Sequence, residues 1–313
     1  MPPPVRRALL VAGVVVTAVV VAVGVDAWLL VHRVPTLAVS TPPTGAGTTY
    51  LVLASDSRER LSPADRDRYA DRNQASGERA DLVLVVDVPE HGEATAYSLP
   101  RDLYVGRERG RPHRLGLSLQ DGAQAVVDSL CRDVGVGVDH VLVADMDALV
   151  QVVDAVGGVE VSTTAPVRDR RAGLDLPRAG SHRLDGAAAL AWVRSRSPEV
   201  QVDGRWVPDP TADPSRTAHA AQVLRAVGAG VDDPVTAQRL VWRAGPRLRR
   251  DDELGLRGLV ALGRAMRSAV AADRVVTVPA RFSGTDVPFA FVTDQTRDAL
   301  AALRTPSCGD PLG

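Results

Sequence analysis

An uninterrupted apolar run near the N-terminus constrains this chain more than any other feature of its sequence. No charged residue occurs between Ala8 and Val25, and further apolar residues follow Asp26. A helix that crosses a bilayer needs about 20 predominantly apolar residues, because only a helix satisfies its own backbone polar groups in lipid. The run therefore predicts a single transmembrane anchor over residues 8–31.

The charges beside this run predict its orientation. Arg6 and Arg7 precede it, and no comparably basic stretch follows it closely. Because basic residues are retained on the cytoplasmic side, residues 1–7 are expected to form a cytoplasmic tail. A cleaved signal peptide is the alternative, although the run is long for one. Both alternatives place the chain from Pro35 onward outside the cytoplasm, and the first holds it at the cell membrane.

The rest of the chain divides into a short linker and one domain. Residues 32–48 are rich in proline, threonine and glycine, which predicts a linker. Residues 49–313 alternate strand-like and helix-like segments without an internal repeat, which predicts one extracytoplasmic α/β domain whose central sheet is covered by helices. Strands are expected at 49–55, 80–88, 92–99, 140–146, 159–163, 274–280 and 289–293, and helices at 121–135, 147–158, 185–196, 216–231, 256–270 and 294–304.

Charge and cysteine content limit the partners and the cross-links. The net charge of -1 provides no basic field, so nucleic acid is not an expected partner. Cys131 and Cys308 are too far apart in sequence for a CxxC metal or redox unit. Outside the cytoplasm they could form one disulfide, and two buried free thiols are the alternative.

Charged residues recur where the predicted strands and helices begin or end. Several arginines together suit a pyrophosphate, because guanidinium groups bind phosphate oxygens in a bidentate way. Two aspartates at neighbouring strand ends suit Mg²⁺, which takes one or two carboxylates together with phosphate oxygens. Arginine and Mg²⁺ on phosphate are the recurring equipment of phosphoryl transfer. The residues in question are Asp56, Arg79, Asp81, Arg101, Asp102, Arg194, Arg196, Asp213 and Arg216.

An ordered set of motifs gives this pattern a family resemblance. The segments "YLVLASDSR", "ERADLVLVV", "YSLPRDLYV", "VVDAVGGVEV", "LDGAAALAWVRSR" and "DPSR" follow one another behind the apolar run. Together they resemble the LytR-CpsA-Psr family, from about Thr48 to Ala226. The resemblance implies a three-layer α/β/α sandwich with a central mixed sheet and an apolar tunnel for a prenyl chain.

The resemblance also implies an activity and a set of roles. Members of this family are membrane-anchored phosphotransferases that move a glycopolymer from a polyprenyl-pyrophosphate carrier to peptidoglycan through a phosphodiester. By the family pattern Asp56 and Asp81 would hold Mg²⁺. Asp102 and Asp213 would orient arginines or assist proton transfer. The pyrophosphate would be bound by Arg79, Arg101, Arg194, Arg196 and Arg216.

Four residues at three places depart from the family pattern and keep other functions open. Gly116 stands where an asparagine is expected, His219 and Ala220 replace an arginine–glutamine pair, and Ala54 replaces a glycine. Losing donors from an anion site weakens it, since each charge-assisted hydrogen bond contributes about 1.5–3 kcal/mol. A non-catalytic binder of prenyl pyrophosphate or wall polymer that regulates an active paralogue is therefore one alternative. A pyrophosphatase that hydrolyses the carrier is another.

Overall fold

A computed structural model describes most of the chain after the apolar run. The described residues are 24–26, 28–29, 32–42, 44–57, 77–106, 112–195, 197–209, 219, 222–223, 225–230, 233–284 and 289–309. None of the helices formed by these residues has the length and apolar character needed to cross a membrane. Most of the predicted anchor lies outside the described residues, so the anchor stays a prediction.

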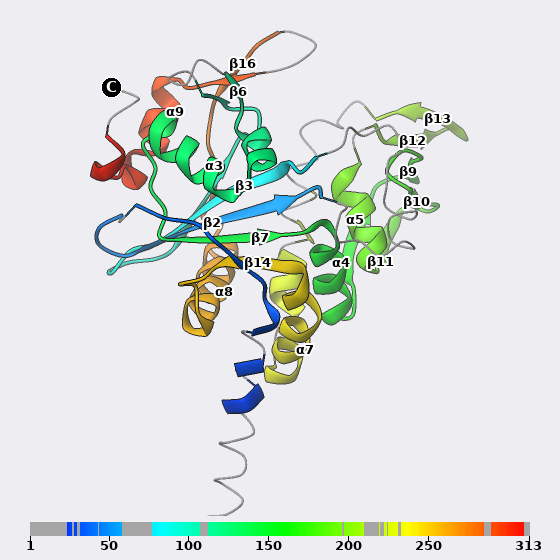
Figure 1. The fold of residues 1–313 in the computed structure, drawn as a ribbon. Helices are drawn as coiled ribbons and strands as arrows, with labels where there is room; N and C mark the ends of the chain where they lie inside the picture. Colours follow the sequence, from blue (N-terminus) through cyan, green and yellow to red (C-terminus); the bar gives the residue numbers. More distant parts are fainter. Residues whose placement is uncertain are drawn as a thin grey trace, which may run out of the picture.

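A seven-stranded mixed sheet forms the centre of the fold (Figure 1), with the strand order β1-β14-β7-β2-β3-β4-β15. β2 runs antiparallel to β3 and parallel to β7, which is why the sheet is mixed. The apolar run predicted as a doubly buried strand is β3, in the middle of the sheet. The strands are β1 (Thr36–Leu37), β2 (Thr48–Ser55), β3 (Ala80–Val88), β4 (Thr95–Leu99), β7 (His140–Ala144), β14 (Leu248–Asp251) and β15 (Val275–Thr277).

Both faces of this sheet are covered, as predicted. On one face, Leu51, Val83 and Val85 pack in a core with α3 and the C-terminal segments. On the other face, Tyr50 and Val86 pack in a second core with α8. Figure 1 shows α3 and α9 on one side of the sheet and α8 on the other. The covering elements are η1 (Leu115–Asp121), α3 (Ala123–Ser129), η2 (Leu130–Val134), α8 (Leu256–Ala271), α9 (Asp294–Ala299), η4 (Ala301–Leu303) and η5 (Pro306–Cys308).

Three further helices pack together beside the sheet: α4 (Met146–Ala155), α5 (Gly186–Arg194) and α7 (Pro234–Ala244). α4 contacts both of the others. At Gly186 a Cβ atom would lie 2.2 Å from the carbonyl oxygen of Val150, so only glycine allows this approach of α5 to α4. The Asp154 carboxylate accepts a 2.8 Å hydrogen bond from the Gly186 amide and fixes the start of α5. This packing determines where the helix carries Arg194 at its C-terminal end.

Several short strands complete the fold, and the sequence analysis predicted few of them. A four-stranded sheet of order β10-β9-β12-β13 and a two-stranded antiparallel sheet of β8 and β11 follow α4. Their bounds are β8 (Val159–Thr163), β9 (Val167–Asp169), β10 (Leu174–Leu176), β11 (Gly180–Leu184), β12 (Glu199–Val202) and β13 (Arg205–Pro208). The remaining pieces are β5 (Tyr104–Val105), β6 (His113–Arg114), η3 (Gly245–Arg247), β16 (Arg281–Phe282) and β17 (Ala290–Phe291).

Parts of the predicted linker over residues 32–48 pack against the domain. Strand β1 pairs in parallel with β14 at the edge of the central sheet, and Val34 is 2% exposed. Thr44 donates a 2.5 Å hydrogen bond to the Asp139 carboxylate. Proline and glycine content indicated a linker, but a two-residue edge strand needs only two ladder partners, which β14 supplies. The domain therefore begins before β2.

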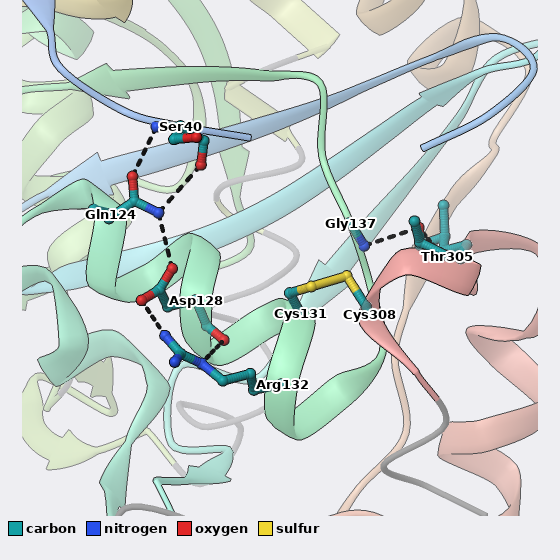
Figure 2. Close-up of a disulfide and its surroundings, with 9 residues drawn as sticks. Ser40, Gln124, Asp128, Cys131, Arg132, Gly137, Thr305 and Cys308 are labelled. Carbon is teal, nitrogen blue, oxygen red and sulfur yellow. Dashed lines mark hydrogen bonds and ion pairs between the residues drawn. A yellow bond between two sulfur atoms is a disulfide. The ribbon is translucent and has the colours of Figure 1, made fainter. Parts of the chain in front are cut away.

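The two cysteines form a disulfide, which decides between the alternatives left open by the sequence (Figure 2). Cys131 lies in η2, directly after α3, and Cys308 lies near the C-terminus, a separation of 177 residues. Beside the bridge the Gly137 amide donates a 3.0 Å hydrogen bond to Thr305 Oγ1. The C-terminal segment is thereby fixed to the sheet-covering layer.

Replacing both Cys131 and Cys308 with serine is expected to lower the free energy of unfolding by about 2–4 kcal/mol, because the bridge closes a very long loop in the unfolded chain. The measurement is the urea midpoint of the oxidised protein and of the variant. The reduced parent protein is the matched control and should unfold where the variant does. An unchanged midpoint in the variant would contradict this assignment of the bridge as a stabilising element.

Candidate functional site

The strand directions bring the predicted site residues to one edge of the central sheet. β2 and β4 both run antiparallel to β3, so β2 and β4 end where β3 begins. Asp56 directly follows β2, Arg79 directly precedes β3, and Arg101 follows Pro100 at the end of β4. The expectation that Pro100 ends a strand is confirmed, since β4 stops at Leu99. We call this group the site edge.

Hydrogen bonds between β2 and β3 fix the backbone at the site edge. The Asp56 amide donates to the Arg79 carbonyl at 2.9 Å, and the Arg79 amide donates to Asp56 Oδ1 at 2.7 Å. The Asp56 side chain is 4% exposed, so its position is set by the fold. The register shifts next to this pair, where Ala54 faces Leu82 but Ser55 faces Ala80. This irregularity leaves Asp81 opposite no β2 residue and exposed at the surface.

Arg101 forms the centre of a charged chain across the site edge. Its guanidinium contacts the Asp81 carboxylate, and its Nε lies 3.7 Å from Asp102 Oδ2. Asp102 in turn accepts from Arg114 Nη1 at 3.3 Å. Arg101 is only about a quarter exposed, and its carbonyl accepts a 2.7 Å bond from the Gly116 amide. The guanidinium is therefore held in place while one side remains open to solvent.

Asp56 and Asp81, predicted to hold Mg²⁺, lie on neighbouring strands, each one residue from the Ser55–Ala80 pair. Within the part of the chain that the structure describes, no group of three or more His, Cys, Asp or Glu side chains could hold a metal ion. Mg²⁺ commonly binds through one or two carboxylates together with substrate phosphate oxygens. The two carboxylates among the described residues therefore fit a cation that substrate phosphate oxygens complete.

A buried ionic network centred on Arg249, which the sequence did not predict, lies next to the site edge and supports it. Arg249 on β14 contacts Glu78, and its Nη2 donates to Asp145 Oδ1 at 2.9 Å. Glu78 also accepts from Ser55 Oγ at 2.6 Å. Burial alone would lower the pKa of the Arg249 guanidinium, but Glu78 and Asp145 outweigh burial and raise it. The network joins β2, the start of β3, the start of α4 and β14. Because Glu78 is part of it and directly precedes Arg79, the network also limits where the Arg79 backbone can lie.

A second missed residue, Asp169 at the end of β9, holds the segment that carries Arg194 and Arg196. It is 2% exposed and accepts from Ser195 Oγ at 2.9 Å and from the Ser197 amide at 3.0 Å. The amides of Arg171 and Ala172 donate to its other oxygen, at 3.0 and 3.2 Å. Burial alone would raise the pKa of the Asp169 carboxyl, but the donors, led by the Ser197 amide, outweigh burial and lower it.

The structure places some of the predicted arginines and leaves others outside the described residues. Arg194 is the last residue of α5 and half-buried. Figure 1 shows the carboxyl end of β2 pointing toward α5, on the side where the site edge lies. The predicted residues Arg196, Asp213 and Arg216, and Ala220 of the departures, lie outside the described residues. The described part of the predicted site is therefore Asp56, Arg79, Asp81, Arg101, Asp102 and Arg194.

His219, which stands where the family pattern has an arginine, packs against α5. Its imidazole stacks on the Trp192 indole with ring centroids 3.9 Å apart, so it is packed and not a solvated surface residue. Burial lowers its pKa, against opposing contributions from the Trp192 backbone and Asp209. The ring is therefore neutral at neutral pH and does not replace the charge of the arginine expected at this position.

Close packing explains why position 116 is a glycine, and the sequence alone could not show this. A Cβ atom at this position would lie 2.6 Å from the Ala80 carbonyl oxygen and 3.2 Å from Arg101 Cβ. The backbone of η1 therefore runs directly against the site edge, where an asparagine side chain has no room. Glycine in place of the expected asparagine therefore allows closer packing around Arg101.

Gly116→Asn is expected to destabilise the fold by about 1–3 kcal/mol, because the added atoms force η1 away from the Ala80 carbonyl. The same shift should displace Arg101 and weaken pyrophosphate binding. Urea unfolding and the KM for a prenyl pyrophosphate measure the two effects. Gly263→Ala in α8, where a Cβ meets nothing within 4 Å, is the control and should be neutral or stabilising. A Gly116→Asn protein with parental stability would refute this account.

A small pocket among the described residues does not coincide with the site edge. Its volume is about 40 Å³, and it lies among α3 and η2 residues such as Ser129 and Arg132. Ligand pockets usually measure about 300–1,000 Å³, so this one cannot hold a prenyl chain. The tunnel implied by the family resemblance therefore stays a prediction.

Comparisons with known proteins agree with the family resemblance of the sequence motifs. Residues 34–244 match the model of the LytR_cpsA_psr family. Probable cell wall biosynthesis protein LcpB of Corynebacterium glutamicum is 33% identical over 190 residues, which cover 60% of this chain and 46% of that protein. The polyisoprenyl-teichoic acid–peptidoglycan teichoic acid transferase TagU of Enterococcus faecalis is 30% identical over 128 residues, covering 40% and 41%. The chain thus spans less than half the length of these curated relatives.

Solved structures extend the likeness to the fold. The LytR-Csp2A-Psr enzyme from Actinomyces oris matches with a TM-score of 0.69 and 30% identity, covering 87% of this chain and 96% of that one. The structure of TagT bound to LI-WTA matches with a TM-score of 0.56 and 18% identity, covering 85% and 97%. The second likeness concerns the fold alone.

Proposed function

This chain belongs to the LytR-CpsA-Psr family, and we propose that it transfers a glycopolymer from a polyprenyl-pyrophosphate carrier to peptidoglycan in bacterial cell-wall assembly. The observation that carries the proposal is the site edge, where Arg101 is held between Asp81 and Asp102 beside Asp56 and Arg79. The N-terminal run would hold the domain on the outer side of the cell membrane, where carrier and acceptor meet. The TagU proteins of Enterococcus faecalis and Halalkalibacterium halodurans, which are similar to this chain, are transferases of teichoic acid to peptidoglycan.

The proposed reaction is an electrostatically assisted phosphoryl transfer. A sugar hydroxyl of peptidoglycan forms a bond to the glycan-side phosphorus, the phosphoanhydride bond breaks, and polyprenyl phosphate leaves while the hydroxyl proton passes to solvent. Arg79, Arg101 and Arg194 bind the pyrophosphate oxygens and stabilise the charge that develops on them. Asp102 keeps Arg101 oriented by contacting it and Arg114. Water in place of the sugar hydroxyl would give the pyrophosphatase alternative.

Magnesium is part of the proposal through the chemistry of Asp56 and Asp81. These carboxylates would hold the ion, which when bound neutralises pyrophosphate charge and favours departure of the leaving group. Arg101 contacts Asp81 in this structure, so that contact must be shared or exchanged when cation and substrate bind. The chain's own contribution is to keep both carboxylates and the arginine on one sheet edge.

The test is phosphate release from geranylgeranyl pyrophosphate by the full chain in detergent, with Mg²⁺ and with EDTA. We expect metal-dependent release that Asp81→Ala and Arg194→Ala each abolish. Arg297→Ala, which removes an exposed ion pair on α9, is the control and should keep parental activity. Lipid binding in a native mass spectrum without release would favour the non-catalytic binder. Release that persists in EDTA would reject the metal assignment.

A further inference from the structure

The segment before β1 is docked onto α7 by specific contacts. Asp26 accepts hydrogen bonds from Gln238 Nε2 at 2.9 Å and from Trp242 Nε1 at 3.1 Å. The Arg33 guanidinium lies 4.0 Å from the centroid of the Trp242 ring. These contacts on two successive turns of α7 fix the direction in which the N-terminal chain leaves the domain. They also decide which face of the domain turns toward a membrane that holds the apolar run Ala8–Val25.

That face carries arginines and no acidic residue within its helices. Figure 1 shows the described N-terminal segment descending beside α7, with α8 on the same side of the sheet. The charged side chains exposed on these two helices are all arginines, and the sequences 234–244 and 256–271 contain no Asp or Glu. We define the α7–α8 face by Val235, Arg239, Arg243, Arg257, Val260, Arg264 and Arg267.

The geometry of α8 gathers its charges into one stripe. Arg257, Val260, Arg264 and Arg267 follow one another three or four positions apart, which places them on one side of the helix. Leu262, on the opposite side, packs against the sheet and is 5% exposed. The stripe therefore points away from the core. Val235 on α7 and Val260 on α8 are 63% and 42% exposed among these arginines.

The acidic residues near this face are Asp26, whose carboxylate is hydrogen-bonded to α7, and residues at the helix ends. Asp233 is engaged as the N-cap of α7, and Asp252, Glu253 and Asp273 flank α8. The opposite layer is acidic on balance: α3, η2 and α9 carry Arg132 and Arg297 against Asp128, Asp133, Asp294 and Asp298. Within the helices themselves, the charge is thus positive on α7 and α8 and negative on α3, η2 and α9, so the helices on the two sides of the central sheet differ in sign.

We propose that the α7–α8 face rests on the anionic headgroups of the membrane that holds the N-terminal anchor. Basic side chains near such a surface are attracted to its negative potential, and exposed valines between them suit the headgroup boundary. The contact orients the domain, whereas the anchor alone would only tether it. The proposal rests on the proposed anchoring and is independent of the transfer chemistry.

The test uses the full chain with Val260→Cys, in which Cys131 and Cys308 remain bridged and residue 260 supplies the free thiol. The chain is reconstituted in vesicles of phosphatidylcholine, with or without phosphatidylglycerol, and labelled with a neutral, membrane-impermeant PEG-maleimide. We expect labelling on the order of tenfold slower with phosphatidylglycerol. High salt should remove the difference by screening. Val207→Cys on β13, 37% exposed, is the matched position and should label equally in both vesicles.

A second variant separates arginine-dependent contact from other causes. Arg257→Gln, Arg264→Gln and Arg267→Gln, combined in the Val260→Cys chain, should restore fast labelling with phosphatidylglycerol. Equal rates in the two vesicles, or slowing that survives in the arginine variant, would overturn the proposal. A chain that does not float with vesicles would overturn the anchoring itself. Protection by added wall glycopolymer in neutral vesicles, without protection by phosphatidylglycerol, would reassign the face to the polymer.

Discussion

Arg101→Ala is expected to lower kcat/KM for release of phosphate from geranylgeranyl pyrophosphate by about 10³-fold, because an arginine on a transferring phosphoryl group contributes at least this much in related chemistry. The site edge places this guanidinium between two carboxylates with one side open to solvent. The loss should fall mainly on kcat, since charge on the phosphate oxygens is greatest in the transition state. Steady-state kinetics with saturating Mg²⁺ measures it.

Two further variants test whether the loss in kcat/KM arises at the site edge. Arg101→Lys keeps the charge but not the bidentate fork and should recover only part of the activity. Arg132→Ala removes an exposed arginine that is paired with Asp128 on α3 and should match the parent protein. An Arg101→Ala enzyme within a factor of about three of the parent would show that the pyrophosphate binds elsewhere.

Asp169→Ala is expected to destabilise the fold by about 3 kcal/mol and to raise the KM for the prenyl pyrophosphate about tenfold. Removal of the carboxylate leaves the Ser195 hydroxyl and the Ser197 amide without their acceptor in a buried position. The segment between them, which carries Arg196 and follows Arg194, would then lose its fixed position. Asp169→Asn, which keeps the shape, should preserve more stability while still raising KM.

The stability contribution of Asp169 should depend on pH in one direction. Its pKa in the folded protein is lowered, so the contribution is fully present above the carboxyl's unfolded pKa and is lost as pH falls through the folded value. Urea midpoints should therefore differ between parent and Asp169→Asn at neutral pH and converge in acid below about pH 4. Asp175→Asn, an exposed position on neighbouring β10, should show no such difference. A gap that stays constant into acid would contradict the assignment.

The sequence predicted the central elements of the fold because their signals are local. The apolar run of β3 and the helical spacing in α3, α4 and α8 appear in the structure near the predicted positions. The Asp185 cap at the start of α5 accepts from the Ala188 amide, as a residue near a helix start should. The residues of the site edge could be predicted from the ends of the expected strands, since the sheet topology brings the ends of β2 and β4 to the start of β3. Asp56, Arg79, Asp81 and Arg101 could be selected for this reason.

The missed elements are those whose burial depends on distant partners. β14 has the sequence LRRD, and no hydropathy pattern predicts a sheet strand there. Arg250 is 8% exposed because it donates to the carbonyls of Asp251, Asp252 and Leu254, while Arg249 is neutralised by Glu78 and Asp145. Glu78 and Asp145 lie more than 100 residues away in sequence from Arg249. Burial of these charges is favourable only with the complete set of partners.

Local physics in the sequence thus determined the alternation of strands and helices, the family motifs and the charged residues at strand ends. The tertiary structure decided the Cys131–Cys308 bridge, the edge strand in the expected linker, the space that requires Gly116 and the neutral packing of His219 on Trp192. It also decided that Glu78 and Asp145 hold Arg249 and that Asp169 holds Ser195, the residue after Arg194. The physical reason is that periodicity and capping act within a few residues. Pairing of buried charges, close backbone approach and disulfide formation depend on which distant segments the fold brings together.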